Sequence, residues 1–227
     1  MLVFSRVTTE PDPAYDVPIW EVDFALRPGE LLLVRLERGH FRVPLADAAV
    51  GLLEPLRGEV RFLGENWQAM PPERAEALRG KCGRVFAGAG WLRSRSVTEN
   101  IILARLHHTA RPEEEIEEEA ANLVRYFGLP GLPLRNPGKT RRDDLGRAAL
   151  ARAFLGRPEL ILLEQPTRHL FPQVLPSLMN AVRAARKRGA AVVWITAEPR
   201  IWNDPALRAD WKGTLFGSRM QLVRREE

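Results

Sequence analysis

The sequence lacks most of the features that mark secreted, membrane-spanning and metal-binding proteins. Its 227 residues include a single cysteine, Cys82, which excludes an internal disulfide and is typical of a reducing compartment. No apolar run approaches the roughly 18 residues that a transmembrane helix needs. The N-terminus has no charged segment followed by an apolar one, so no secretory signal is expected. The four histidines have no spacing typical of a metal site.

Basic charge is in excess but is not concentrated anywhere. The formal net charge is +5 and the pI is about 10.0, yet no block of five or more basic residues occurs. This balance is compatible with work near the anionic inner leaflet of a membrane, and we expect no nucleic-acid partner. The acidic run at 113–119 has apolar residues at helical spacing around it. A solvated helix face is therefore favoured there over a metal site or a site for a basic partner.

Short apolar runs alternate with helical patterns through most of the chain. The continuous apolar segments at 31–36, 160–163 and 191–195 are typical of strands buried on both faces. Their alternation with helices predicts an α/β fold with a parallel sheet, and alternating strands near both ends suggest an antiparallel layer beside it. The other predicted elements are strands over 2–7, 20–26, 58–62 and 84–86, helices over 45–53, 72–78, 112–127 and 175–188, and a hairpin over 214–224.

The most informative segment runs from Gly146 to Thr167, GRAALARAFLGRPELILLEQPT. It predicts a helix, a Gly-Arg-Pro stop and a buried strand that ends in Glu164 and Gln165. The segment resembles the part of ATP-binding cassette (ABC) ATPases that carries the catalytic carboxylates, and the resemblance extends over nearly the whole chain. It implies a P-loop NTPase (RecA-like) fold: a parallel sheet core, an N-terminal antiparallel β layer and a helical subdomain at about 90–150, all in one domain over 1–227.

The phosphate-binding loop implied by this resemblance is degenerate. In the family it reads G-x-x-x-x-G-K-[ST], and its backbone N–H groups, Lys and hydroxyl hold the phosphates and Mg²⁺. Here Gly39 remains, but Phe41 replaces a glycine, Arg42 replaces the Lys and Val43 replaces the hydroxyl residue. Glu37 is expected to face the phosphate position with a negative charge. Arg42 is still able to pair with a phosphate, although a solvent-facing or ion-paired side chain is the favoured interpretation.

The other catalytic positions implied by the resemblance are also replaced. Ala87 stands where the family has the Q-loop Gln, and Ala197 stands where it has the switch His. Gln165 replaces the general base, and Gln cannot accept a proton near neutral pH. Glu164 replaces the Asp linked to Mg²⁺ and is a weak candidate metal ligand. The signature motif falls at 140–144, TRRDD, where the acidic residues favour a structural helix start and would repel a phosphate.

The roles of the segment at Trp91 and of Tyr15 are left open by the sequence. The resemblance implies that a membrane subunit docks near Trp91, Leu92 and Arg93, where Trp91 and Leu92 are possible anchors. Ordinary core packing of Trp91 and Leu92 is an equally good alternative. Tyr15 lies near the position at which an aromatic ring stacks on adenine in the family.

The resemblance implies a transporter subunit that has lost its ATPase. Segments such as Gly64 to Asn66 and Phe86 to Asn100 look most like the Mla-type ATPase of MCE phospholipid transporters. We expect a pseudo-ATPase docked on an integral-membrane permease at the cytoplasmic face of the inner membrane, as a homodimer or beside another ABC ATPase subunit. The Mla-type resemblance adds an MCE-type lipid-binding protein as a candidate partner. No cofactor is expected. The alternative is a functional or asymmetric ABC ATPase that binds ATP and Mg²⁺ with a partner chain, and a third possibility is a soluble regulator that kept only the fold.

Overall fold

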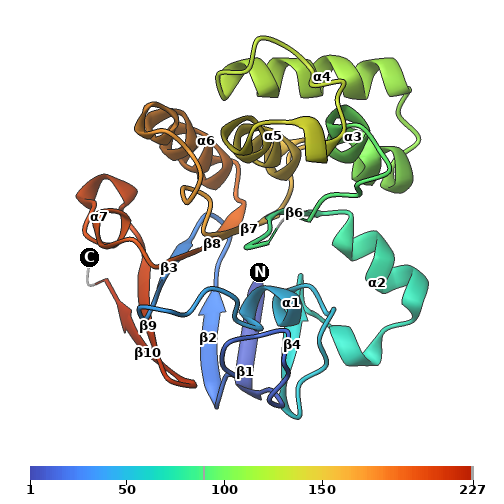
Figure 1. Cartoon of the computed structure of the whole chain (residues 1–227). Helices are drawn as coiled ribbons and strands as arrows, with labels where there is room; N and C mark the ends of the chain where they lie inside the picture. Colours follow the sequence, from blue (N-terminus) through green and yellow to red (C-terminus); the bar gives the residue numbers. More distant parts are fainter. Residues whose placement is uncertain (89, 226–227) are drawn as a thin grey trace.

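The computed structural model describes residues 1–88 and 90–225, which form two sheets and seven α-helices within that part of the chain (Figure 1). The strands are β1 (Leu2–Thr8), β2 (Val22–Leu26), β3 (Leu31–Leu36), β4 (Arg57–Phe62), β5 (Glu65–Asn66), β6 (Cys82–Val85), β7 (Leu160–Glu164), β8 (Ala191–Thr196), β9 (Trp211–Phe216) and β10 (Arg219–Arg224). The helices are α1 (Leu45–Ala49), α2 (Pro72–Arg79), α3 (Val97–His108), α4 (Glu113–Tyr126), α5 (Arg142–Phe154), α6 (Leu175–Lys187) and α7 (Pro199–Trp202).

The main sheet has the strand order β10-β9-β3-β8-β7-β6 and is parallel except for the pairing of β10 with β9. Every residue of β7 and β8 is buried, which explains why these strands read as unbroken apolar runs. The register pairs Arg35 with Thr196 and Glu164 with Ile195. The carboxyl ends of β3, β7 and β8 therefore lie together at one edge of the sheet, where open α/β sheets bind their ligands.

The two faces of the main sheet are covered by different layers. The smaller antiparallel sheet, in the order β2-β1-β4-β5, packs with α1 against one face, which presents Leu32, Val34 and Leu162 among others. Helices α3 to α6 cover the opposite face, which presents Leu33 and the fully buried Trp194 (Figure 1). The predicted parallel core, N-terminal antiparallel layer and helical region are thus all confirmed.

Three details differ from the sequence-based predictions. The helix expected over 45–53 ends at Ala49, because Gly51 has a φ of +64° and a Cβ there would lie 2.6 Å from the Trp67 ring. The strand expected from Trp20 begins at Val22, and Trp20 makes only an isolated bridge to Arg219. The C-terminal hairpin extends the main sheet through the parallel pairing of β9 with β3, and so lies outside the antiparallel layer.

Within residues 1–88 and 90–225, no helix is both long and apolar enough to cross a bilayer.

Candidate functional site

The candidate site lies where the loop between β3 and α1 meets the carboxyl ends of β7 and β8. In this loop Gly39 adopts a φ of +94°, which permits the turn. Val43 is buried and supplies no hydroxyl, and Pro44, the N-cap residue of α1, has no N–H group. The sequence therefore provides few of the donors that a phosphate-binding loop of this kind offers.

Two of the remaining loop N–H groups donate to a carboxylate of the same chain. The backbone N–H groups of Phe41 and Arg42 donate to Oδ2 of Asp16 at 2.5 and 2.6 Å. The N–H of Asp16 donates in turn to the Arg42 carbonyl at 2.9 Å. Burial raises the pKa of Asp16, but the two backbone hydrogen bonds outweigh it and bring the pKa below its ordinary value. The carboxylate is thus bound to the loop as an anion.

The side chains of this loop contact different parts of the chain. The guanidinium of Arg42 is exposed, with its carbon 5.8 Å from the centroid of the Tyr15 ring. Oε2 of Glu37 accepts the Gly217 N–H at 2.9 Å, so Glu37 ties the loop to the β9–β10 hairpin. The ring of Phe41 lies under Arg168, whose guanidinium carbon is 3.7 Å from the ring centroid. The expectation that Glu37 faces a phosphate position stays a prediction.

A buried polar chain runs beneath the loop. The Tyr15 hydroxyl donates to Oδ2 of Asp47 at 2.7 Å, and the other oxygen of Asp47 accepts from Nη1 of Arg84 at 2.7 Å. Nε of Arg84 donates to Oε1 of Glu164 at 2.6 Å. One guanidinium on β6 thus joins a carboxylate on α1 to one at the end of β7. The sequence analysis did not identify Arg84, Asp47 or Asp16 as site residues. The available signals were a charged residue within a short strand, for Arg84, and a charged residue within an otherwise apolar helix, for Asp47.

The pKa values in this chain follow from burial and from Arg84. Burial raises the pKa of Asp47, but the hydrogen bond and charge of Arg84 outweigh it, and the net shift is downward. Glu164 is more deeply buried, and desolvation raises its pKa in spite of Arg84. Tyr15 has its pKa raised by burial and by its hydrogen bond to Asp47, which keeps the phenol protonated as a donor. The Tyr15 hydroxyl therefore serves as a hydrogen-bond donor to Asp47.

The positions of the family's catalytic residues lie together but carry no acid–base pair. Oε1 of Gln165 accepts the Ala197 N–H at 3.0 Å, and Gln165 and Ala87 line the same pocket. Gln165 has a φ of +48°, and its N–H donates to the Ile195 carbonyl at 2.9 Å. The amide Nε2 of Gln165 is buried and has no hydrogen-bond partner among the described residues. An amide and two alanines offer no group that could accept a proton from water.

The predicted docking residues divide into one packed side chain and two surface ones. Trp91 packs against the core of the helical layer, with the Arg152 guanidinium carbon 4.3 Å from its ring centroid. Leu92 is 49% exposed and Arg93 is exposed. The Leu92 N–H donates to Oδ1 of Asn100 at 2.7 Å, which holds this loop against α3. Core packing thus accounts for Trp91, while Leu92 and Arg93 remain available to a partner.

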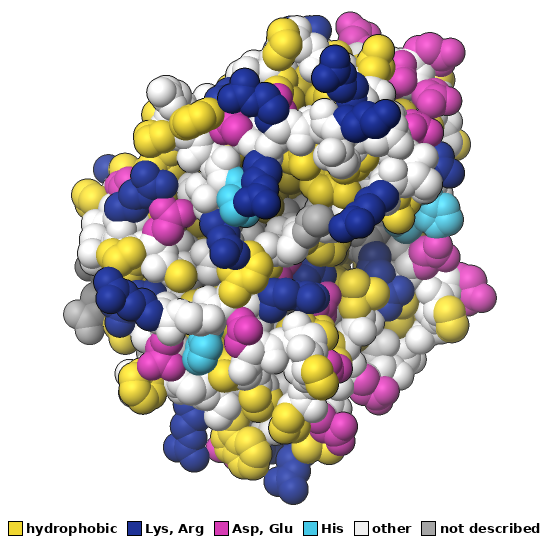
Figure 2. Space-filling view, viewed as in Figure 1, with side chains coloured by type: hydrophobic (Ala, Val, Ile, Leu, Met, Phe, Trp, Pro, Cys, Tyr) yellow, Lys and Arg dark blue, Asp and Glu magenta, His cyan; other side chains and the backbone are white. Residues whose placement is uncertain are grey.

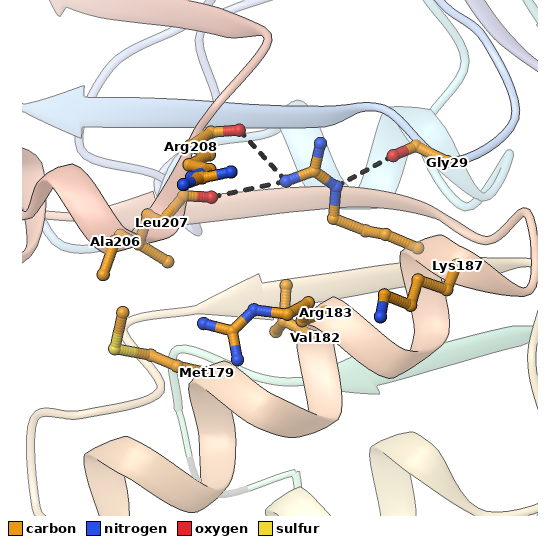
Figure 3. Close-up of a pocket in the computed structure, with 9 residues that line it drawn as sticks. Gly29, Met179, Val182, Arg183, Lys187, Ala206, Leu207 and Arg208 are labelled. Carbon is orange, nitrogen blue, oxygen red and sulfur yellow. Dashed lines mark hydrogen bonds between the residues drawn. The ribbon is translucent and has the colours of Figure 1, made fainter.

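Another pocket, separate from the one lined by Gln165 and Ala87, lies between α6 and the turn after α7 and has a volume of about 610 Å³ (Figure 3). Gly29, which precedes β3, lines it, so this pocket lies at the amino edge of the sheet. Arg186 is held by the carbonyls of Gly29, Leu207 and Arg208. Arg183 donates to Oδ1 of Asn180. These contacts give Arg183 and Arg186 structural roles.

No cluster of metal-binding side chains is found in the part of the chain that the structure describes. Within it, no three His, Cys, Asp or Glu side chains lie close enough to hold a metal ion. Glu164, the weak candidate ligand, is paired with Arg84.

No protein-family model matches the chain. Comparison with known proteins nevertheless gives similar sequences. The chain is 27% identical over 193 residues to an L-cystine transport system ATP-binding protein of Escherichia coli K12, which covers 83% of the chain and 77% of that relative. It is 29% identical over 188 residues to a probable anion import ATP-binding protein of Haloferax volcanii, covering 78% and 65%. It is 28% identical over 182 residues to a macrolide export ATP-binding/permease protein of Chlorobium luteolum, covering 79% of the chain but only 27% of that larger protein.

The fold is shared with solved ATP-binding cassettes. The dimeric cassette MJ0796, in a post-hydrolysis state bound to ADP and Pi, superposes with a TM-score of 0.84 at 18% identity, covering 100% of both chains. A second dimeric structure of this cassette gives a TM-score of 0.85 at 19% identity, also over both whole chains. The protein therefore has the P-loop NTPase fold in its ABC cassette form. The sequence matches, at 27 to 29% identity, are likewise to ATP-binding proteins of import and export systems.

Proposed function

We propose that this chain is the cassette subunit of a membrane transporter and that it docks on a permease without hydrolysing ATP. The observation that carries the proposal is that the chain's own charged groups occupy the donors and acceptors which Mg-ATP would need. Asp16 accepts the N–H groups of Phe41 and Arg42. Arg84 donates to the carboxylate of Glu164. The transporter context comes from the relatives, whose names describe import and export systems.

The described residues do not fit a triphosphate at the loop. A phosphate-binding loop holds its ligand through backbone N–H groups that converge on the anion. Here those of Phe41 and Arg42 already bind Asp16. A triphosphate would have to displace a carboxylate that is covalently part of the chain, and therefore present at high effective concentration. It would also meet the side chain of Phe41, where the family has only backbone.

The described residues do not fit Mg²⁺ or a general base either. Mg²⁺ needs several oxygen ligands in near-octahedral geometry. Val43 offers none, and Glu164 is bound to a cation that cannot be deprotonated. Gln165 has no basic oxygen with which to activate water. Each deficiency alone would weaken hydrolysis, and together they remove the groups for binding and for chemistry.

The proposed partner is an integral-membrane permease at the cytoplasmic face of the inner membrane. Leu92 and Arg93 lie exposed beside the start of α3, the surface at which the family resemblance implies docking. The two matched MJ0796 structures are dimers, and one relative combines an ATP-binding and a permease part. We propose that this chain also pairs, either with itself or with another ABC ATPase subunit.

Lipid transport with an MCE-type protein is the narrower form of this proposal. Its support is the resemblance of segments such as Gly64 to Asn66 to the Mla-type ATPase. Co-expression of the tagged chain with a permease and an MCE protein, followed by purification in detergent, tests it. Recovery of all three proteins in a stable ratio is expected, and recovery of the permease alone would remove the lipid assignment.

Calorimetric titration with Mg-ATP tests the loss of the ATPase directly. We expect no saturable binding below about 1 mM, which corresponds to less than roughly 4 kcal/mol of binding free energy. We also expect that Gln165→Glu, which restores a carboxylate at the general-base position, yields no phosphate release, because the triphosphate site is not formed. Saturable sub-millimolar binding, or hydrolysis by this variant, would favour the alternative of an ATPase that works with a partner.

A further inference from the structure

The pocket of about 610 Å³ between α6 and the turn after α7 (205–208) has an apolar floor. Val182 and Leu207 are buried and form this floor, and Met179 packs beside them against the core of the helical layer. Figure 3 shows Met179 and Arg183 extending from α6 toward the turn on the opposite wall. Two separate elements thus enclose an apolar surface that no described side chain covers.

The rim of this pocket is basic. Four of its lining residues are Arg or Lys, and none is an Asp or a Glu. Among these four, Arg186 has an acidic partner, because it pairs with Asp210 at 2.6 Å. Arg183, Lys187 and Arg208 are exposed and form no ion pair with any described residue. A group that entered the pocket would therefore meet three cations without counter-charge.

One of these cations comes from a backbone conformation that favours glycine. Arg208 ends the turn after α7 with a φ of +45°, which residues with a Cβ rarely adopt. The turn is held on both sides of its centre: Oδ1 of Asp204 accepts the Ala206 N–H at 2.9 Å, and the Arg208 carbonyl accepts from Arg186 at 3.0 Å. Glycine at this position would relieve the strain, but it would remove a cation from the rim of the pocket.

This arrangement fits a segment of polypeptide better than a small molecule. Small-molecule sites place a few fixed polar groups inside an apolar pocket. Here none of the buried side-chain polar atoms that lack a partner among the described residues belongs to the pocket. An apolar centre within an exposed polar rim is instead the pattern of protein interfaces. The occupant therefore needs an apolar side chain for the floor and carboxylates for the rim.

The basic surface continues on the other side of the turn. A neighbouring pocket of about 550 Å³ shares Leu207 and Arg208 with the first one and includes Lys212 of β9. Asp204 is its one acidic lining residue, and it is already bonded to the Ala206 N–H. Arg208 thus lies between two adjoining hollows, and a stretch of polypeptide spans such a surface more readily than a single small anion does.

We propose that the pocket of about 610 Å³ docks an acidic segment of a partner protein. An apolar side chain of this segment covers Val182 and Leu207, and its carboxylates pair with the cations of the rim. Charge complementarity of this kind speeds association and sets specificity. The pocket lies at the amino edge of the main sheet, whereas the candidate site lies at the carboxyl edge. The inference therefore goes beyond the proposed function and does not depend on it.

Helix α4 of a second copy is the other acidic candidate, and it fits less well. Figure 2 shows acidic side chains gathered at the end of the molecule where α4 lies, and Figure 1 places α4 far from α7. Glu113, Glu114 and Glu118 are exposed on this helix, but Ile116 among them is fully buried in its own core. A second copy would supply carboxylates without an apolar side chain for the floor.

Fluorescence anisotropy of a labelled synthetic peptide, titrated with the full chain, tests the proposal. The probe has the sequence EELEELEE, and a second probe has serine in place of each leucine. We expect saturable binding of the leucine probe with a Kd below about 1 mM. It should bind about fivefold tighter than the serine probe or better, because only leucine removes apolar area of the floor from water.

Arg183→Glu should weaken binding of the leucine probe by about fivefold or more, because it replaces an attraction by a repulsion. Arg125→Glu on α4 is the matched control. Arg125 is exposed and donates to Asn122 at 2.8 Å, just as Arg183 donates to Asn180 at 2.7 Å. This control should leave the affinity unchanged. Ala206→Trp should fill the pocket from its exposed wall and remove the preference for leucine over serine.

Several results would overturn the proposal. One is the absence of saturable binding below about 1 mM, and others are equal affinity for the two probes or an equal loss in Arg125→Glu. Binding of the chain to phosphatidylglycerol vesicles that Arg183→Glu abolishes, with neither peptide bound, would assign the surface to membrane lipid instead. Self-association of the chain in sedimentation that Arg183→Glu abolishes would assign it to a second copy.

Discussion

Nε of Arg84 lies 2.6 Å from Oε1 of Glu164, in a position where both side chains are almost wholly buried. The same guanidinium binds Asp47 through Nη1. A buried ion pair of this kind adds little net stability compared with apolar packing, but breaking it leaves an uncompensated charge. Arg84 thus holds two carboxylates in place and keeps them from other cations.

Replacement of Arg84 by leucine should be strongly destabilising. It leaves Asp47 and Glu164 buried without their cation, and the expected loss is about 3–5 kcal/mol of unfolding free energy. Urea denaturation at pH 7 measures this loss. Adding Glu164→Gln to Arg84→Leu should recover part of it, because one of the two unpaired charges is removed.

The control for this prediction is Arg61→Gln on β4. Arg61 pairs with Glu59 at 2.8 Å, but Arg61 is exposed and Glu59 is only half-buried, and pairs at the surface contribute little. The urea midpoint should hardly change. If the losses in Arg84→Leu and Arg61→Gln were equal, the buried chain would have no special role in stability.

Asp16→Asn should loosen the loop without unfolding the protein. The amide that replaces the carboxylate is uncharged, and hydrogen bonds to charged acceptors are about twice as strong as those between neutral groups. We expect faster hydrogen exchange at the amides of Phe41 and Arg42, whereas amides within β8 should exchange as before. An unchanged exchange rate at both loop amides would show that Asp16 does not hold the loop.

The contact of Asp16 with the loop should also depend on pH. The pKa of Asp16 lies below its ordinary 3.8 in the folded protein. The contact is therefore complete above this ordinary pKa and is lost as the pH falls through the lower folded-state value. The amide chemical shifts of Phe41 and Arg42 should titrate together in that acidic window. In Asp16→Asn they should not titrate there, and a transition that persisted in this variant would have to come from another group.

Much of the fold was predictable because strands that are buried on both faces have uninterrupted apolar sequences. The fully apolar runs of β7 and β8 indicated a buried parallel sheet, and this was confirmed. The hairpin of β9 and β10 was harder to place, because its alternating pattern is the same at the edge of a parallel sheet as in an antiparallel layer. Its partner strand, β3, is set by tertiary packing that no local pattern records.

The site was predictable only where a substitution changed a motif. Phe41, Val43 and Gln165 stood out because the motif positions expect other residue types. The contact between Asp16 and Phe41 spans 25 residues, and the one between Arg84 and Glu164 spans 80. Neither pair has a spacing signal, since each depends on how strands and loops meet in three dimensions.

Leu92→Glu should weaken docking on a permease and leave the fold intact. Leu92 is 49% exposed, so a charge there costs the isolated chain little. At an interface it would be desolvated, and a loss of at least about 1 kcal/mol corresponds to roughly fivefold weaker association. Co-purification with a co-expressed permease measures this. Val223→Glu, at a residue 67% exposed on β10, is the control and should co-purify like the unchanged chain.

Arg168→Gln should raise the pKa of His169 in the protein without ligand. Burial is the main cause that keeps this pKa low, and the charges of Arg168 and Arg142 lower it further. Because an adjacent cation disfavours imidazolium, removal of Arg168 moves the pKa upward, and protonation begins at a higher pH. Titration of the His169 ring by NMR measures the shift. Arg183→Gln should leave the titration where it was, since Arg183 is not among the groups that act on His169. If His169 titrated identically in both variants, the charge of Arg168 would not act on His169.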